Sequence, residues 1–366
     1  MIRSSILRLI QTLVVITTPT ASMAFWGKDY LEPPPIIRTE PPNAQEVQKL
    51  QFGRLSMNDQ AQRFGLAKHA PLIPDWSAAK SGKLLGSWNP LSHEGRHPTL
   101  VIQHGGVGGP GSIDYGHARW FLSRGYNVLI LDSFWSRGFI ANWRKIDAPA
   151  SEHLRAFSTL GANTRARDAF AAAHWLREQP QVDKDRIFLI GGSQGGWSVL
   201  RAFTDEKSIT DQNKGLFRAG ISIYPMCWSW QSTPTKDAMD TTPAIRPRLG
   251  PFYSPILMLT VELEPPGSAT DINTCDPNLT KMVHRHIRLA NATHAFDDEN
   301  PPENPIDRCW YSANPHWCNS SGGRDPVTGN CRNAPKPDFC SDQQMTSTAR
   351  NAMLEFLRGF GPNTPQ

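Results

Sequence analysis

A serine set between glycines is the first candidate for chemistry. The stretch Gly191-Gly192-Ser193-Gln194-Gly195 has the form G-x-S-x-G and lies between the apolar run 186–190 and a helical pattern over 194–203. This strand–turn–helix context is typical of a nucleophile elbow, which exposes the serine hydroxyl at the carboxyl end of a sheet. The helix N-terminus would favour negative charge beside the serine. The sequence therefore predicts Ser193 as a catalytic nucleophile; an ordinary glycine-rich turn is the alternative.

A second glycine-rich segment, His104-Gly105-Gly106-Val107-Gly108-Gly109, follows the apolar run 99–103. Acyl transfer needs backbone N–H groups that hold the oxyanion. We expect one donor at Gln194, directly after the serine, and the other at Gly106 or Val107. A phosphate-binding loop is the rival interpretation, but the segment lacks the Gly-Lys-Ser/Thr ending of such loops. His104 precedes the serine in the chain and is expected to orient this loop.

The general base should be a histidine in a loop that follows a late strand. His294 meets this description, because it comes shortly after the predicted strand 284–289. His284 and His286 lie inside that strand and are expected to be structural. His316 lies in a cysteine-rich stretch. We therefore predict that His294 is the base.

The third member of a triad would be a carboxylate that fixes the tautomer of His294 and stabilises its protonated form. Glu264 follows the predicted strand 255–261 and is our choice. The alternatives are Glu262, Asp271, Asp237 and Asp240.

Substrate contacts are expected after the predicted strands, at the same carboxyl edge of the sheet. The candidates are Phe134, Trp135, Arg137 and Trp228. Arg137 could pair with a substrate carboxylate or with Asp132. For the aromatic side chains, the alternative is a place in the core.

Short apolar strands that alternate with amphipathic helices predict a mostly parallel sheet with helices on both faces, an α/β fold. The expected strands are 99–103, 126–131, 186–190, 219–224, 255–261 and a weaker 284–289. The expected helices are 56–66, 113–123, 163–178 with Asn163 as N-cap, 194–203 and 346–360. Residues 25–97 have weak periodicity and are interpreted as a Pro-rich N-terminal extension, so that the main domain covers 98–366.

The N-terminus has the pattern of a secretory signal peptide over residues 1–24. Arg3 and Arg8 form a basic start, the run 9–18 is apolar but short, and Ser22-Met23-Ala24 is a typical cleavage site. The prediction is a secreted or periplasmic protein with no membrane segment after cleavage. An uncleaved membrane anchor is the alternative.

Cysteine usage agrees with export. All six cysteines lie after the predicted signal, and none forms a CxxC motif. Four of them fall in a Pro-rich stretch, 301–342, which we interpret as a disulfide-rich insertion. Three disulfides are expected, with the pairing left open, among Cys227, Cys275, Cys309, Cys318, Cys331 and Cys340.

Composition limits the function classes. The 366 residues carry a net charge of +5, from 38 basic and 33 acidic residues, and 39% of them are hydrophobic. This charge is too mild to indicate a nucleic-acid partner, and the hydrophobic content excludes a wholly disordered chain. No metal or organic cofactor is implied, and the oligomeric state is left open.

Four pieces in order resemble the dienelactone hydrolase family of the α/β-hydrolase superfamily. They are HGGVGG after a strand, Asp132-Ser133-Phe134 with Arg137-Gly138 after the next strand, GGSQGG, and THAFD near the end. The resemblance covers about residues 98–300 and implies an α/β-hydrolase fold. The family's name-giving members have cysteine where this chain has Ser193, and usually Asp as the acid.

The leading hypothesis is therefore a secreted serine hydrolase that cleaves a carboxylic ester of a small molecule or carbohydrate through an acyl-enzyme. A peptidase or acyltransferase on the same triad is the alternative among enzymes. A secreted binding protein without catalysis is the alternative outside them.

Overall fold

The computed structural model describes residues 57–74, 83–106, 109–134, 136, 161–205, 212–226, 251–264, 270–274, 278–299, 309–310 and 339–361. Several predictions concern residues outside this set. They are the signal peptide 1–24, Val107, Trp135, Arg137, Trp228, His316, Asp237, Asp240, Cys227, Cys275, Cys318 and Cys331.

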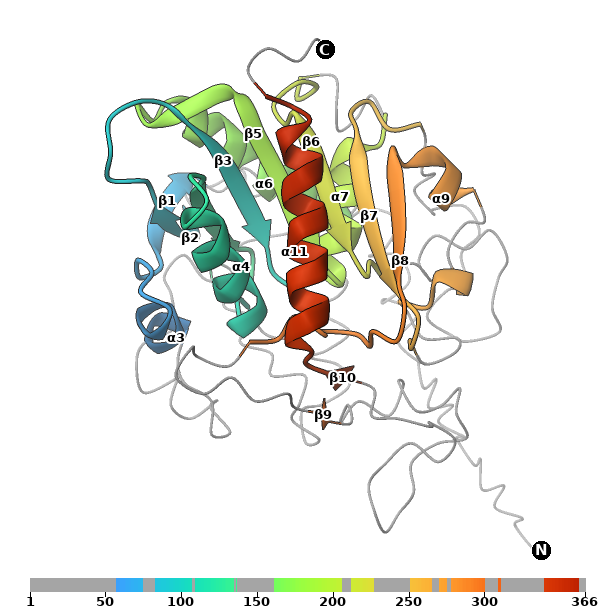
Figure 1. Ribbon diagram of the computed structural model, residues 1–366. Coiled ribbons are helices and arrows are strands. Elements are labelled where there is room, and N and C mark those ends of the chain that lie inside the picture. Colours follow the sequence, from blue (N-terminus) through green and yellow to red (C-terminus); the bar gives the residue numbers. More distant parts are fainter. Residues whose placement is uncertain are drawn as a thin grey trace, which may run out of the picture.

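An eight-stranded sheet with the order β1-β2-β4-β3-β5-β6-β7-β8 forms the centre of the fold (Figure 1). β2 pairs antiparallel with β1 and β4, and the strands from β4 to β8 are parallel. This is the topology of the α/β-hydrolase fold, as the resemblance implied. The strands are β1 Ala70–Pro74, β2 Lys83–Asn89, β3 His97–Gln103, β4 Asn127–Asp132, β5 Val182–Gly192, β6 Ala219–Ile223, β7 Ile256–Val261 and β8 Arg285–Leu289.

Helices cover both faces of the sheet, as predicted. α4 (Ser112–Leu122) and α11 (Gln343–Arg358) lie in front of it in Figure 1, with α3 (Met57–Arg63) beside them. α6 (Ala162–Arg177) and α7 (Gln194–Phe203) lie behind it. Each face therefore has its own apolar core, and β4 is buried along its whole length, as a strand covered on both sides must be. The short α9 (Leu279–Met282) and η3 (Ile272–Thr274) precede β8.

The elements with strong hydrophobic periodicity are confirmed to within a few residues, and α7 has the bounds predicted for it. The prediction was wrong about the start of the main domain at residue 98. β1 and β2 lie within 25–97 and pair into the same sheet as β4. The signal of β1 was weak because this strand contains two prolines, which an edge strand tolerates.

The N-cap of α6 also differs from the prediction. It is Gly161, and Asn163 instead lies buried inside the helix, where it accepts a hydrogen bond from Arg201. α11 begins at Gln343 rather than 346, because the Asp342 side chain accepts from the N–H of Met345 and caps the helix.

A two-stranded ladder lies within the predicted insertion 301–342. β9 (Cys309–Trp310) and β10 (Phe339–Cys340) pair antiparallel, with the backbones of Cys309 and Cys340 directly opposite each other. Of the helices that the structure describes, none is long and apolar enough to cross a membrane.

Candidate active site

Ser193 stands at a sharp turn between β5 and α7. Its backbone has φ 56° and ψ −118°, a strained conformation for a residue with a side chain. The turn is so tight that a Cβ on Gly191 would lie 2.5 Å from the Gly195 carbonyl. A Cβ on Gly195 would in turn clash with the Gln103 carbonyl oxygen at the end of β3. Both glycines are therefore required by close backbone approach, as predicted for a nucleophile elbow.

Backbone strain gathers at this edge of the sheet. Four non-glycine residues in the described part have positive φ: Ser193, Tyr224, Asn291 and Ala295. They follow the carboxyl ends of β5, β6 and β8. Each such conformation costs about 1–3 kcal/mol, and it persists only where the surroundings enforce it. Strain of this kind is typical of functional sites and singles out the carboxyl edge.

The structure brings His294 and Glu264 together. The distance from His294 Nδ1 to Glu264 Oε1 is 2.7 Å, and only 6% and 4% of these side chains are exposed. Since the carboxylate can only accept, Nδ1 carries the proton, and the lone pair of the neutral ring is on Nε2. The other Glu264 oxygen accepts from the Thr270 hydroxyl at 2.7 Å. Two hydrogen bonds therefore fix the carboxylate against the imidazole.

The described alternatives for acid and base make other contacts. Glu262 accepts from the Asn291 backbone N–H at 2.9 Å on the surface. Asp271 accepts from the backbone and side chain of Asn273. His286 on β8 is hydrogen-bonded at 2.8 Å to the Thr260 hydroxyl on the neighbouring parallel strand β7. A contact between paired strands is expected of a structural residue.

The two predicted sources of oxyanion-hole donors lie side by side. A Cβ on Gly105 would lie 3.7 Å from Ser193 Cβ, and one on Gly106 would lie 3.2 Å from Gln194 Oε1. Gln194 is the first residue of α7, and the first N–H groups of a helix have no partner within that helix. The loop after β3 and the start of α7 therefore meet at Ser193.

The buried His104 side chain supports this loop from the protein core. It is fully buried, and its Nε2 accepts from the Ser133 N–H at 3.3 Å, so Nδ1 donates to the Gly105 carbonyl at 2.6 Å. Burial, with the nearby Arg165 guanidinium, holds the pKa of His104 well below its ordinary value. His104 is thus neutral, and its approach to Asp132 at 3.8 Å is not an ion pair.

Phe134, a predicted substrate contact, is fully buried. Its ring packs edge-on against His104, with a centroid distance of 4.8 Å. The side chain therefore supports the loop from the core and does not line an exposed surface, which was the alternative stated for the aromatic candidates.

The loop that carries His294 is tied to β6 and α4. The Tyr224 ring packs on the His294 ring at a centroid distance of 4.5 Å, and its hydroxyl donates to Asp297 Oδ1 at 2.5 Å. His117 Nε2 donates to Asp297 Oδ2 at 2.7 Å. Burial alone would raise the pKa of Asp297, but His117 and Tyr224 outweigh it and hold that pKa below its usual range. Asp297 therefore remains a carboxylate between two donors.

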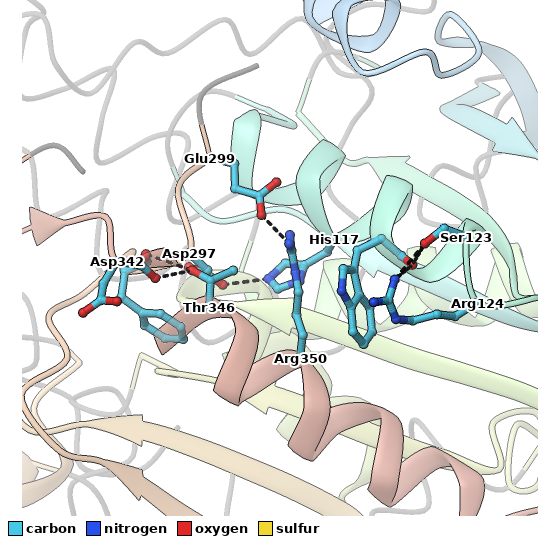
Figure 2. Close-up of polar contacts among 10 residues, drawn as sticks. His117, Ser123, Arg124, Asp297, Glu299, Asp342, Thr346 and Arg350 are labelled. Atoms are coloured by element: carbon cyan, nitrogen blue, oxygen red, sulfur yellow. Dashed lines mark hydrogen bonds and ion pairs between the residues drawn. The ribbon is translucent and has the colours of Figure 1, made fainter. Parts of the chain in front are cut away.

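Helix α11 adds a second anchor to the same loop (Figure 2). The Phe296 carbonyl accepts from the Asp342 N–H at 2.7 Å and from the Thr346 hydroxyl at 3.2 Å. Arg350 donates to His117 Nδ1 at 3.3 Å and forms an ion pair with Glu299. The C-terminal helix thus fixes the backbone just beyond His294.

Sequence reasoning assigned no role to Asp297, Thr270 or Arg165. Asp297 stood in the THAFD piece, but its partner His117 is 180 residues away. Thr270 had no signal, since a hydroxyl near an acid in sequence is common. Arg165 lies in a helix whose alanine-rich pattern indicated only packing.

The carboxyl group of Asp114 lies near Asp297 and gives a testable pH dependence. Burial raises the pKa of Asp114 to about 7, Asp297 adds to the effect, and the Gly111 N–H and Arg165 oppose it. Between the ordinary pKa and about pH 7, the folded protein holds a proton that the unfolded chain has released, so stability falls as pH rises.

We expect Asp114→Asn to stabilise the protein at pH 8 by the order of 1–4 kcal/mol and to leave stability at pH 4 nearly unchanged. Denaturant unfolding at both values measures this, with the exposed Asp185→Asn as the control that should gain nothing. An equal effect of Asp114→Asn at the two pH values would contradict it.

Within the described ranges, no group of three or more His, Cys, Asp or Glu side chains is arranged to hold a metal ion.

Comparisons with known proteins find hydrolases. Residues 116–243 match the model of the prolyl oligopeptidase family. Dipeptidyl aminopeptidase BIII of Pseudoxanthomonas mexicana is 27% identical over 148 residues, which cover 37% of this chain and 20% of that protein. The chain thus matches about a fifth of that relative's length.

Solved structures with a similar fold include two hydrolases. A dienelactone hydrolase-like promiscuous phosphotriesterase from metagenomic libraries is 16% identical, with a TM-score of 0.47 and coverage of 81% of this chain and 99% of that one. An esterase from Thermogutta terrifontis is 12% identical, with a TM-score of 0.48 and coverage of 83% and 97%.

The stretch 116–243 includes the Ser193 turn, and its family match agrees with the strand order and the elbow geometry. The chain has the α/β-hydrolase fold.

Proposed function

We propose that the protein is a serine hydrolase that cleaves a carboxylic ester of a small molecule or carbohydrate. Ser193 is the nucleophile, His294 the general base and Glu264 the acid that orients the base. The observation that carries this proposal is the buried 2.7 Å contact from His294 to Glu264, at the same sheet edge as the strained Ser193 turn. An elbow serine, an orienting acid and a base in this chain order are typical of α/β-hydrolases.

The proposed reaction is acyl transfer in two halves. His294 Nε2 takes the proton from the Ser193 hydroxyl as the oxygen attacks the ester carbonyl. The N–H groups of Gln194 and of Gly106 or Val107 donate to the oxyanion. Glu264 stabilises the imidazolium, which then protonates the leaving alkoxide. His294 then deprotonates a water molecule as it attacks the acyl carbon, and the imidazolium returns this proton to the Ser193 oxygen as the carboxylic acid is released.

A fluorophosphonate probe tests the proposal most directly. Purified protein is expected to become covalently labelled at Ser193, as located by peptide mass spectrometry, and to hydrolyse short p-nitrophenyl esters. A protein that neither labels nor hydrolyses would support the binding-protein alternative.

A peptidase is the second candidate, favoured by the prolyl oligopeptidase family match and by the dipeptidyl aminopeptidase relative. Both reactions use the same triad, and the leaving group is chosen by pocket shape. Comparing kcat/KM for p-nitrophenyl esters and for dipeptidyl p-nitroanilides separates the two. We expect the esters to be preferred.

We further propose that the mature protein is exported and contains disulfides. The support is the signal-like pattern over 1–24 and the six cysteines beyond it. Mature protein isolated from the exporting cell is expected to begin near Phe25. An N-terminus that still carries residues 1–24 would favour the membrane-anchor alternative.

The backbone register of β9 and β10 supports one pairing among those left open by the sequence. Residues directly opposite in an antiparallel pair have Cα atoms about 4.5–5.5 Å apart, within the range of about 4.4–6.8 Å found across disulfides. Cys309 and Cys340 occupy such positions. We expect them to be linked, and the link to stabilise the fold by about 3–4 kcal/mol through the loop that it closes.

Peptide mapping without reductant checks the pairing, with a reduced sample as control. Free thiols at Cys309 and Cys340 in exported protein, or linkage of either to another cysteine, would show the pairing to be wrong.

A further inference from the structure

We propose that Arg165 is a positioning residue for the oxyanion hole. Its buried guanidinium joins the two backbone segments that supply the oxyanion donors. This inference rests on the proposed hydrolase function, and it adds a residue that the reaction needs although it does not touch the substrate.

The glycines of the loop after β3 cannot fix its conformation by themselves. Residues 104–109 include four glycines, Gly105, Gly106, Gly108 and Gly109. Glycine is the residue with the greatest backbone freedom, and it has no side chain that could anchor the loop to the core. An oxyanion hole stabilises charge only if its donors are held in place before the reaction. The glycines must therefore be anchored by side chains other than their own, and His104 supplies only part of this support.

Arg165 provides an anchor on the loop side. It is fully buried near the start of α6, and its Nη2 donates to the His104 carbonyl oxygen, which directly precedes the glycines. The Arg165 carbonyl in turn accepts from the Gln103 side chain at 2.6 Å. Helix α6 is thereby tied to the end of β3 through both the side chain and the backbone of one residue.

The same guanidinium reaches the other half of the oxyanion hole. Its Nη1 donates to Gln194 Oε1 at 3.1 Å, and Gln194 is also fully buried. A Cβ on Gly106 would lie against this same Gln194 oxygen, so the loop glycine, the glutamine amide and the guanidinium are neighbours. Arg165 therefore sets the spacing between the Gln194 N–H and the loop N–H groups. Arginine suits this task because its rigid fork holds two acceptors at a fixed separation.

Arg201 is a matched control for the loss of a buried guanidinium. It is 1% exposed, lies on α7 and donates to the Asn163 side chain on α6. It thus bridges the same two helices as Arg165, away from the loop after β3. A purely structural role for Arg165 predicts equal effects of replacing either arginine.

The test compares Arg165→Met, Arg165→Lys and Arg201→Met in the full-length mature protein. A p-nitrophenyl ester is the substrate, and the assay temperature lies below the melting temperature of every variant. We expect Arg165→Met to lower kcat by about 10–100-fold with less than about a threefold change in KM, since misplaced donors weaken the transition state alone. Lysine has a compact ammonium in place of the planar fork, so it cannot hold the two acceptors at the same separation and should restore little. Arg201→Met should change kcat by less than about threefold.

Affinity for a boronic-acid inhibitor, which forms a tetrahedral adduct with the serine, should fall in parallel with kcat only in the Arg165 variants. Equal kcat losses in the Arg165 and Arg201 variants, or a loss in KM alone, would overturn the proposal. If Arg165→Met does not fold, Gln194→Met removes one of the two bonds and keeps the backbone donor; an unchanged kcat there would also overturn it. A wild-type protein without any esterase or peptidase activity would instead refute the proposed function itself.

Discussion

Ser193→Ala is expected to lower the turnover of a short aryl ester by about 10³–10⁶-fold. The alanine has no oxygen to form the acyl-enzyme, so His294 has no hydroxyl proton to take and the acyl-transfer route is closed. The residual rate would come from the oxyanion hole and substrate binding alone. Steady-state kinetics with a p-nitrophenyl ester, together with the loss of fluorophosphonate labelling, measures the effect.

The matched control is Ser198→Ala, which removes a hydroxyl from the same helix. Ser198 is fully buried in α7, one turn beyond the elbow, and the proposed reaction does not use it. We expect it to keep activity within about threefold, because the change leaves the interactions made in the transition state in place. Both variants should melt close to the wild type. A Ser193→Ala protein that kept more than about a tenth of the wild-type rate would exclude Ser193 as the nucleophile.

The elements with a strong local signal could be predicted from the sequence. β4 is an uninterrupted apolar run and α7 has a clear amphipathic pattern, so both were found with nearly correct bounds. β1 and β2 were missed because pairing with neighbouring strands, rather than a pattern in their own residues, stabilises them. The pairing of β2 with β4 joins segments that no local pattern connects.

The same distinction applies to the site. The order of Ser193, Glu264 and His294 along the chain could be predicted, because each follows a strand that ends at the same edge. The residues that hold them could not. Arg165 contacts His104 across 61 positions, and Arg350 contacts His117 across 233. Such contacts exist only once the sheet has brought the helices together, so they leave no pattern in the sequence.

Glu262 and Glu264 both follow β7, and the structure gives a physical reason to prefer Glu264 as the acid. β7 ends at Val261, and the N–H groups of the next two residues donate to the carbonyls of Leu289 and Ala292. The chain thus runs along the end of β8 before Glu264 turns inward to His294. Glu262 is left on the surface beside Asn291.

Glu264→Gln is expected to lower kcat by about 10²–10⁴-fold, and Glu262→Gln by less than about threefold. The amide keeps the size of the carboxylate but loses its charge, so the imidazolium formed during the reaction is no longer stabilised. If its NH₂ group turns to His294 Nδ1, the ring must carry its proton on Nε2, which cannot then accept from Ser193. The Thr270 hydroxyl permits either orientation, because it can donate or accept.

Measuring kcat for both glutamine variants beside the wild type compares the same chemical change at two sites two residues apart. Glu262→Gln loses only an exposed hydrogen bond to a backbone N–H, so it controls for any general effect of removing a charge from this turn. Equal and small losses in both variants would move the acid to Asp271, Asp237 or Asp240. A large loss confined to Glu264→Gln would identify the contact with His294 as part of the catalytic machinery, because the two substitutions differ in that contact and not in their chemistry.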